Sequence, residues 1–228
     1  MITLKRFLKI LLSKDIPTWP QVDRSKIKFG QPEYDWTFSP LNIGKESIVY
    51  SFGIGRDISF DLALIENFGV KVFAFDPTPK SIAWLRSQKL PSGFKYFPIG
   101  LSDQDRLADF YEIDGEQSVS YSEVKLDAQV KTQSPVALRV CRFSTICEML
   151  RHDRVDILKL DIEGSEYGVI PDVLASKIEI GQILVEFHHR HNRIRVAKTR
   201  EMIKLMNQQG YLIFDVSPNG YEYSFIKQ

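Results

Sequence analysis

The sequence has few cysteines, almost no excess charge and no long apolar run. Cys141 and Cys147 are its two cysteines among 228 residues, which excludes a disulfide framework or a zinc site of paired cysteines and favours a reducing, cytoplasmic compartment. Thirty basic and 29 acidic residues leave a formal net charge of +1, which argues against nucleic-acid binding by bulk electrostatics. No apolar run is long enough to span a membrane.

The remaining composition is that of a folded domain. Hydrophobic residues make up 43% of the chain and charged residues 26%, so a sizeable core is expected. We assign it to residues 47–228, preceded by a helix and an irregular arm over residues 1–46. Residues 1–14 are interpreted as a basic amphipathic helix that packs on the domain or a partner, with weak contact to a membrane surface as the alternative. Trp36, in the arm, either covers a ligand pocket or anchors the core.

A glycine turn organises the predicted domain. Residues 48–61 run from a β-branched strand through Gly53 and Gly55 into an apolar helical face. Such turns hold nucleotide-like cofactors in α/β proteins, although an ordinary strand-to-helix turn is the alternative. A dinucleotide site would have a third glycine, which is missing, and Asp57 places a carboxylate where a pyrophosphate would lie. The turn therefore favours a ligand with a cationic or zwitterionic end, such as S-adenosylmethionine.

Acidic residues follow two of the predicted strands. Asp76 ends the strand at residues 71–75, about 20 residues past the glycines, where a carboxylate commonly accepts hydrogen bonds from ribose hydroxyls. A surface acid in a loop is the alternative. Asp161 and Glu163 follow the buried strand at residues 155–160. Because α/β proteins bind ligands at the carboxyl ends of their strands, we expect these acids to mark a site.

The strand and helix pattern breaks once. Within residues 105–142, two alternating stretches at 107–111 and 136–141 are predicted to form a hairpin-like insertion, with a mobile tip at 113–135 on the acceptor side. The chain then returns to strands and helices and ends in a hairpin at residues 211–226.

Three stretches of the sequence resemble those of a known family. The run LKLDIEGSEYGVI, with YSFGIGRDISFD and FAFDPTP upstream, is similar to the FkbM-type S-adenosylmethionine-dependent methyltransferases, over residues 36 to 226. The resemblance implies a class I fold: a doubly wound, Rossmann-like α/β sheet of seven mostly parallel strands with an antiparallel last strand. It also implies O-methylation of a hydroxyl on a glycan or small metabolite. Ser51 departs from the usual class I turn, in which an acid stands at that position.

The expected cofactor contacts come from the glycine turn and from the loops after three further strands. They are Ser51, Phe52, Gly53, Gly55, Asp57, Asp76, Pro77, Leu101, Ser102 and Asp161. Two rival interpretations remain. A nicotinamide oxidoreductase would have the third glycine, and a non-catalytic module of the same fold would have a filled or acid-free pocket.

The catalytic candidates are Asp161, Glu163, His188 and His189. The two histidines follow a strand, and side chains alternate along a strand, so we expect one of them to face the site. We favour a histidine as the base because its pKa lies nearest neutrality, with structural hydrogen bonds as the alternative. A metal held by Asp161 and a histidine would resemble the magnesium site of catechol O-methyltransferases. Magnesium prefers oxygen ligands, however, so no metal is predicted.

Overall fold

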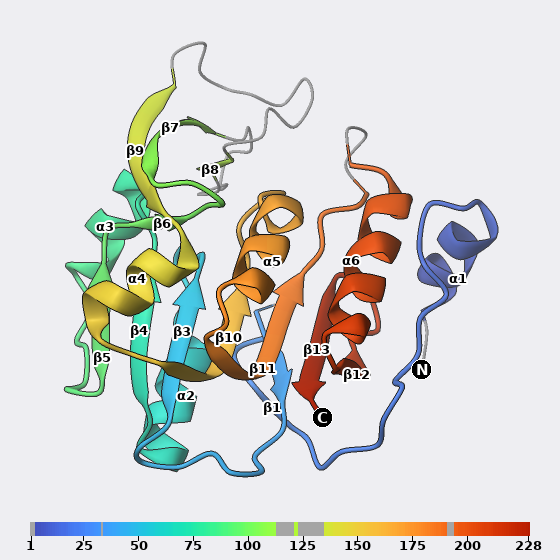
Figure 1. Cartoon of the computed structure of the whole chain (residues 1–228), viewed down its shortest axis with the longest axis horizontal. Helices are drawn as coiled ribbons and strands as arrows, with labels where there is room; N and C mark the ends of the chain where they lie inside the picture. The colour runs from blue at the N-terminus through green and yellow to red at the C-terminus, as the bar shows by residue number, and fades with distance from the viewer. Residues whose placement is uncertain (1–2, 33, 113–120, 123–134, 191–193) are drawn as a thin grey trace.

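The computed structural model describes residues 3–32, 34–112, 121–122, 135–190 and 194–228 (Figure 1). Its central sheet has seven strands, in the order β12 (Tyr211–Val216), β13 (Glu222–Lys227), β11 (Glu179–Glu186), β10 (Arg154–Leu160), β3 (Ile48–Phe52), β4 (Lys71–Phe75) and β5 (Phe94–Phe97). β13 pairs antiparallel with both of its neighbours, and the other pairings are parallel. The predicted seven-stranded sheet with an antiparallel last strand is confirmed.

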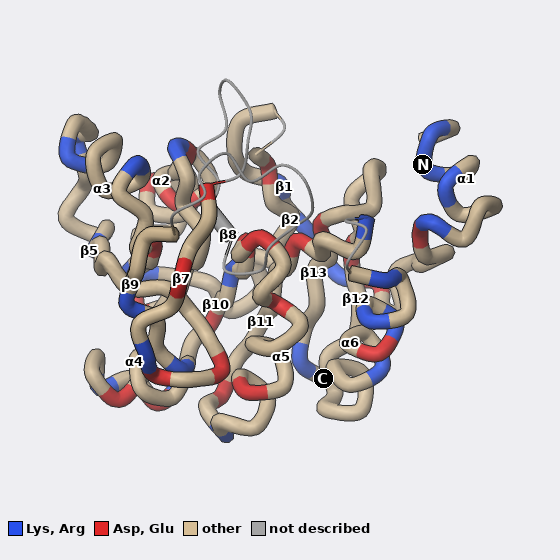
Figure 2. The backbone as a smooth tube through the Cα atoms, turned by 90° about the horizontal axis from the view of Figure 1, so that it is seen from above, with Lys and Arg blue, Asp and Glu red and all other residues tan. Residues whose placement is uncertain are grey.

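Helices cover both faces of this sheet (Figure 2). One face carries α2 (Ser59–Phe68) and α3 (Pro79–Leu85), and the other carries α4 (Phe143–Leu150), α5 (Glu166–Ala175) and α6 (Val196–Gln208). Because both faces are buried, the central strands are almost continuously apolar, as in other parallel sheets. Along β3, Val49 packs toward α2 while Tyr50 and Phe52 pack toward the opposite helices.

The predicted insertion forms a small second sheet. β7 (Arg106–Glu112) and β9 (Val136–Cys141) pair antiparallel, as the alternating sequence pattern indicates. β6 (Gly100–Leu101) and β8 (Tyr121–Ser122) extend this sheet at its two edges. The predicted tip at residues 113–135 lies almost entirely outside the described residues.

The N-terminal arm is more regular than the sequence suggests. The predicted helix is present as α1 (Leu4–Leu11), and the stretch after it, expected to be irregular, contains a two-stranded hairpin of β1 (Ile27–Phe29) and β2 (Trp36–Phe38). Each strand has three residues, too few for a clear alternating pattern. Trp36 and Phe38 are buried with Val49 in the core on the α2 face, so the arm shares the core of the domain. None of the helices in the described ranges combines the length and apolar character needed to cross a bilayer.

Asp15 fastens the arm to the far end of the chain. Its buried carboxylate accepts hydrogen bonds from the Ile16 amide at 2.6 Å and from the Arg190 guanidinium, and lies 3.3 Å from His189 Nε2 and 3.8 Å from Arg6 Nε. Burial alone would raise the pKa of Asp15, but its hydrogen bonds to His189, Arg190 and Ile16 lower it to about 2. The arm and the loop after β11 are therefore joined through one ionised carboxylate.

Replacing Asp15 is expected to loosen this junction. Asp15→Ala should lower the free energy of unfolding by about 3–5 kcal/mol, because Arg6 and Arg190 lose a buried counter-charge. The pKa of Asp15 is lower in the folded state, so its stabilising effect is complete above about pH 4 and is lost as the pH falls toward 2. Urea unfolding at pH 7 and pH 3 measures both effects.

Asp23→Ala is the matched control, since Asp23 is exposed in the same arm. It should change the free energy of unfolding by less than about 0.5 kcal/mol. Equal stability of Asp15→Ala and the wild type at pH 7 would contradict the assigned role.

Candidate functional site

A cavity of about 540 Å³ lies at the carboxyl ends of β3, β4, β10 and β11. This volume falls in the range of small-molecule sites. The expected cofactor residues that line it are Phe52, Gly53, Gly55, Asp57, Asp76, Pro77, Leu101 and Asp161. Ser51 and Ser102 are buried but are not among its lining residues. Ser51 pairs with Lys159 in the sheet and alternates with Phe52, so it lies on the other face of β3.

Gly53 is required by the protein's own backbone. Its φ is +75°, and an added Cβ would lie 1.6 Å from the carbonyl oxygen of Asp161. The Asp161 amide donates to the Phe52 carbonyl at 3.1 Å, and the Gly53 amide donates to the Phe75 carbonyl at 3.1 Å. The turn is thus bound to both neighbouring strands, and it holds the start of the β10 loop against the cavity.

Asp76 also supports the turn. One carboxylate oxygen accepts from the amides of Ile54 and Gly55, each at 3.1 Å, and from the Ser81 hydroxyl at 2.9 Å. The other accepts from the Thr78 amide at 2.9 Å and from its hydroxyl at 2.6 Å. A carboxylate has about four acceptor positions, so donors of the protein occupy those of Asp76. The ribose contact stays a prediction, and the sequence alone did not indicate this structural role of Asp76.

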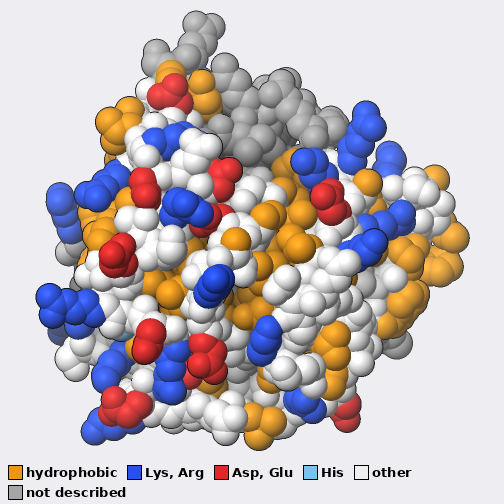
Figure 3. Space-filling model, in the orientation of Figure 1, with side chains coloured by type: hydrophobic (Ala, Val, Ile, Leu, Met, Phe, Trp, Pro, Cys, Tyr) orange, Lys and Arg blue, Asp and Glu red, His pale blue; other side chains and the backbone are white. Residues whose placement is uncertain are grey.

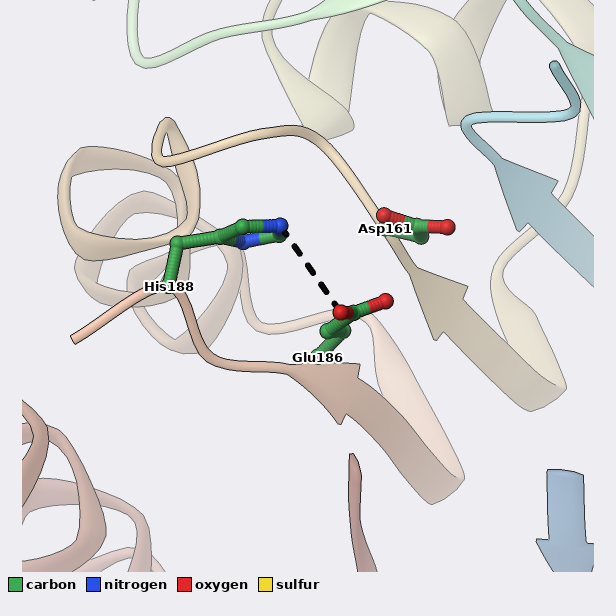
Figure 4. Close-up of side chains that lie close together, drawn as sticks. All are labelled: Asp161, Glu186 and His188. Atoms are coloured by element: carbon green, nitrogen blue, oxygen red, sulfur yellow. Dashed lines mark ion pairs between the residues drawn. The ribbon is translucent and has the colours of Figure 1, made fainter. Parts of the chain in front are cut away.

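A cluster of acids surrounds one histidine at the other end of the cavity (Figure 4). One ligand atom from each of Asp161, Glu186 and His188 lies within 4.8 Å of the others. The His188 ring is 3.1 Å from Glu166 through Nδ1, and through Nε2 it is 3.4 Å from Glu163 and 3.9 Å from Glu186. Asp161, Glu163 and Glu186 line the cavity directly.

Glu166 fixes the position of His188. It is fully buried, and one of its oxygens accepts from the His188 amide at 2.9 Å as well as lying beside the ring. Its other oxygen accepts from the Gly164 amide at 2.9 Å, which ties down the loop after β10. The two glutamates of the sequence motif therefore have different roles. Glu163 lines the cavity, whereas Glu166 orients His188.

Three groups of this cluster have shifted pKa values. Burial lowers the pKa of His188, but the surrounding carboxylates, Glu166 foremost, outweigh it and raise that pKa well above its usual value. Burial raises the pKa of Asp161 to about 6 against the opposing effect of Lys159. Burial also raises the pKa of Glu186 well above its usual value. At neutral pH the histidine is therefore an imidazolium, and Asp161 and Glu186 hold protons more readily than ordinary acids.

His189 lies away from this cluster. Its ring is buried against the N-terminal arm, with Nε2 3.3 Å from Asp15. Of the two candidate histidines, the structure brings His188 alone to the acids.

Trp36 serves both purposes considered for it. Its side chain is buried in the core and also lines the cavity. Lys159 lies 4.9 Å from the centre of its ring and donates to the Gly53 carbonyl at 3.0 Å. The tryptophan therefore joins the arm to the base of the glycine turn.

Within the part of the chain that the structure describes, Asp161, Glu186 and His188 could together hold a divalent cation, because two carboxylates and an imidazole are ordinary metal ligands. The positive charge of the His188 imidazolium can neutralise part of the charge of these acids in place of a metal ion. The sequence-based prediction that no metal is used therefore stays a prediction, which removal of metal ions can test.

Sequence comparisons relate this chain to methyltransferases. A family model described as the methyltransferase FkbM domain matches residues 42–213. Probable methyltransferase-like protein 24 of Homo sapiens and of Rattus norvegicus are 25% and 24% identical over 146 residues, or 63% of this chain. That match spans 33% of each relative, so the chain corresponds to about a third of their length.

The fold also has a counterpart among solved structures. The crystal structure of methyltransferase FkbM from Methylobacillus flagellatus KT superposes with a TM-score of 0.50 at 13% identity. The superposition covers 82% of this chain and 44% of that chain. At this identity the similarity supports the fold alone.

The role of Asp76 can be tested without any ligand. Asp76→Asn should lower the free energy of unfolding by about 1–3 kcal/mol, because the amide replaces an acceptor with a donor and leaves buried N–H groups of the turn unpaired. Urea unfolding of the ligand-free protein measures this, with the exposed Asp109→Asn as control. If Asp76 served a ribose alone, the stability of the ligand-free variant would not change.

Proposed function

The chain belongs to the FkbM methyltransferase family, and we propose on that premise that it transfers a methyl group from S-adenosylmethionine to a hydroxyl oxygen of a glycan or small metabolite. The observation that carries the proposal is the acidic end of the cavity, lined by Asp161, Glu163, Glu186 and Glu222. Negative charge suits a ligand whose reacting end is cationic, and it opposes the pyrophosphate of a nicotinamide cofactor.

The remaining walls fit the rest of such a cofactor. Phe52, Phe75, Leu101 and Phe110 give the cavity apolar surfaces that suit a nucleoside base. Asp161 and Glu163, on the loop after β10, would face the cationic sulfur and the ammonium group. S-adenosylmethionine supplies an activated methyl group, which leaves binding, orientation and proton transfer to the protein.

We assign proton transfer to the carboxylate of Asp161, with Glu186 beside it. A hydroxyl becomes a better nucleophile as its proton moves to a nearby acceptor. A carboxyl group with a pKa of about 6 is a stronger base than an ordinary aspartate and is still mainly ionised at neutral pH. His188 already carries a proton there, so its surroundings favour it as a fixed cation that Glu166 orients. This differs from the preference for a histidine base that the sequence suggests.

A non-catalytic module of the same fold is the alternative from another functional class. It would have no use for several half-buried carboxylates around an accessible cavity, because their desolvation is unfavourable. The alternative thus leaves the acidic end of the cavity without an explanation, whereas a cationic cofactor gives it one.

Ligand binding and product formation test the proposed function together. Calorimetry should show S-adenosylmethionine binding, and NAD⁺ should give no signal. A screen of hydroxyl-bearing glycans and metabolites should then release S-adenosylhomocysteine with at least one acceptor, in the presence of a metal chelator as well as without it. No binding of S-adenosylmethionine would overturn the proposal, and turnover that stops on chelation would overturn the metal-free version.

The pH profile identifies the base. Turnover of the wild type should fall as the pH drops below about 6, where Asp161 becomes protonated. Asp161→Asn should lower kcat by about 10²–10⁴-fold while leaving the circular dichroism spectrum unchanged.

His188→Gln provides the contrast. The positive charge of His188 lowers the pKa of Asp161, so its removal should raise that pKa and move the profile to higher pH, with the maximal kcat largely kept. Loss of turnover at every pH in His188→Gln, together with full turnover in Asp161→Asn, would make the histidine the base.

A further inference from the structure

Helix α1 turns its apolar side away from the domain. Four large apolar side chains of the helix, and that of the residue directly after it, are at least half exposed. They are Leu4 (76%), Phe7 (50%), Leu8 (51%), Leu11 (66%) and Leu12 (67%). Within the helix, Arg6 is the buried residue. The helix lies at the edge of the molecule, and Figure 3 shows hydrophobic side chains gathered at that edge beside Lys and Arg. A surface helix normally has the opposite orientation, with its apolar side against the core.

The outward orientation is held by specific bonds. The Arg6 guanidinium donates to the carbonyls of Ser217 at 3.1 Å and Ile16 at 3.4 Å, and its Nε lies 3.8 Å from Asp15. Thr3 caps the helix by accepting from the Arg6 amide at 3.2 Å. Because the polar side of α1 is bonded to the domain, the leucines cannot turn inward without breaking a buried ion pair.

The exposed charged side chains within residues 3–14 are all positive. Lys5 and Lys14 are exposed, and Lys9 is half-buried with its ammonium group 5.9 Å from the ring of Tyr221. Residues 3–14 contain no acid, and the acid that follows, Asp15, is buried and paired. Exposed apolar side chains flanked by lysines are the composition of helices that lie in the interface of an anionic membrane.

We propose that α1 docks this protein onto an anionic lipid surface, with its leucines at the boundary of head groups and acyl chains and its lysines on lipid phosphates. A second copy of the chain fits the helix less well. Its eight residues form a helix about 12 Å long, which is too short to bury the roughly 1,200 Å² of a stable protein interface. Two such helices would also bring their lysines together. A lipid surface needs no matching shape, and its negative charge complements the lysines.

Vesicle flotation tests the docking directly. The full chain should float with vesicles of phosphatidylcholine containing phosphatidylglycerol at low salt, and should bind pure phosphatidylcholine vesicles or vesicles in high salt more weakly. The double variant Leu8→Glu and Leu11→Glu should bind at least roughly tenfold more weakly, because two charges would enter the apolar region. Both side chains are exposed, so its thermal unfolding should match that of the wild type.

Leu41→Glu is the matched control, since Leu41 is 53% exposed outside α1. It should float like the wild type. The proposal is overturned if the wild type stays unbound at low salt, or if the double variant floats equally well. It is also overturned if sedimentation shows a dimer that the double variant abolishes, which would make a second copy the partner. Binding of S-adenosylmethionine should be the same in all variants, so this test is independent of the proposed activity.

Discussion

The close approach of Gly53 to the carbonyl of Asp161 is the constraint on which the site depends. Any side chain at residue 53 would overlap that carbonyl, so only glycine lets the ends of β3 and β10 lie this close together. The contact brings the glycine turn beside the acids that follow β10. Lys159 reinforces it by donating to the Gly53 carbonyl, and Asp76 holds the amides that come next in the turn. Contacts within the protein therefore fix the shape of the turn without any ligand.

Negative charge dominates the cavity that this contact creates. Asp161, Glu163 and Glu186 reach it from two neighbouring strands, and Glu222 joins them because it lies opposite Glu186 in the sheet. His188 offsets part of this charge, and its position depends on Glu166, which contributes nothing to the cavity surface. The imidazolium of His188 is therefore held in one position, and the acids that line the cavity face the space where a cationic ligand would bind. The electrostatics therefore favour methyl transfer over dinucleotide chemistry.

The N-terminal arm contributes to the molecule in two separate ways. Its hairpin brings Trp36 under the glycine turn, where the ring packs against Lys159 and lines the cavity. Its helix is fastened through Arg6 and Asp15 with the apolar side outward. One part thus completes the site, while the other presents a surface that the domain leaves uncovered.

Local patterns in the sequence were sufficient to predict the strands of the domain, and the resemblance to the methyltransferase family implied how they are arranged in the sheet. Apolar runs, glycines and turn residues are signals that extend over only a few residues, so they predict the strands. Because parallel strands end at one edge of a sheet, the same signals place the acids after β4 and β10 at that edge. The three-residue strands of the hairpin were too short for this signal. Alternation along β11 indicated that one histidine would face the site, but it could not say which neighbours each would meet.

Those neighbours were decided by tertiary structure alone. His189 meets Asp15 across 174 residues of sequence, and Arg6 meets Ser217 across 211. Asp76 stands at the position of a ribose-binding acid, yet its oxygens are filled by backbone and hydroxyl donors of its own loops. Hydrogen bonds and buried charges depend on distances between segments far apart in the chain, which no local pattern encodes. The sequence by itself therefore determined which strand ends carry the acids, and the folded chain decided which partners their oxygens meet.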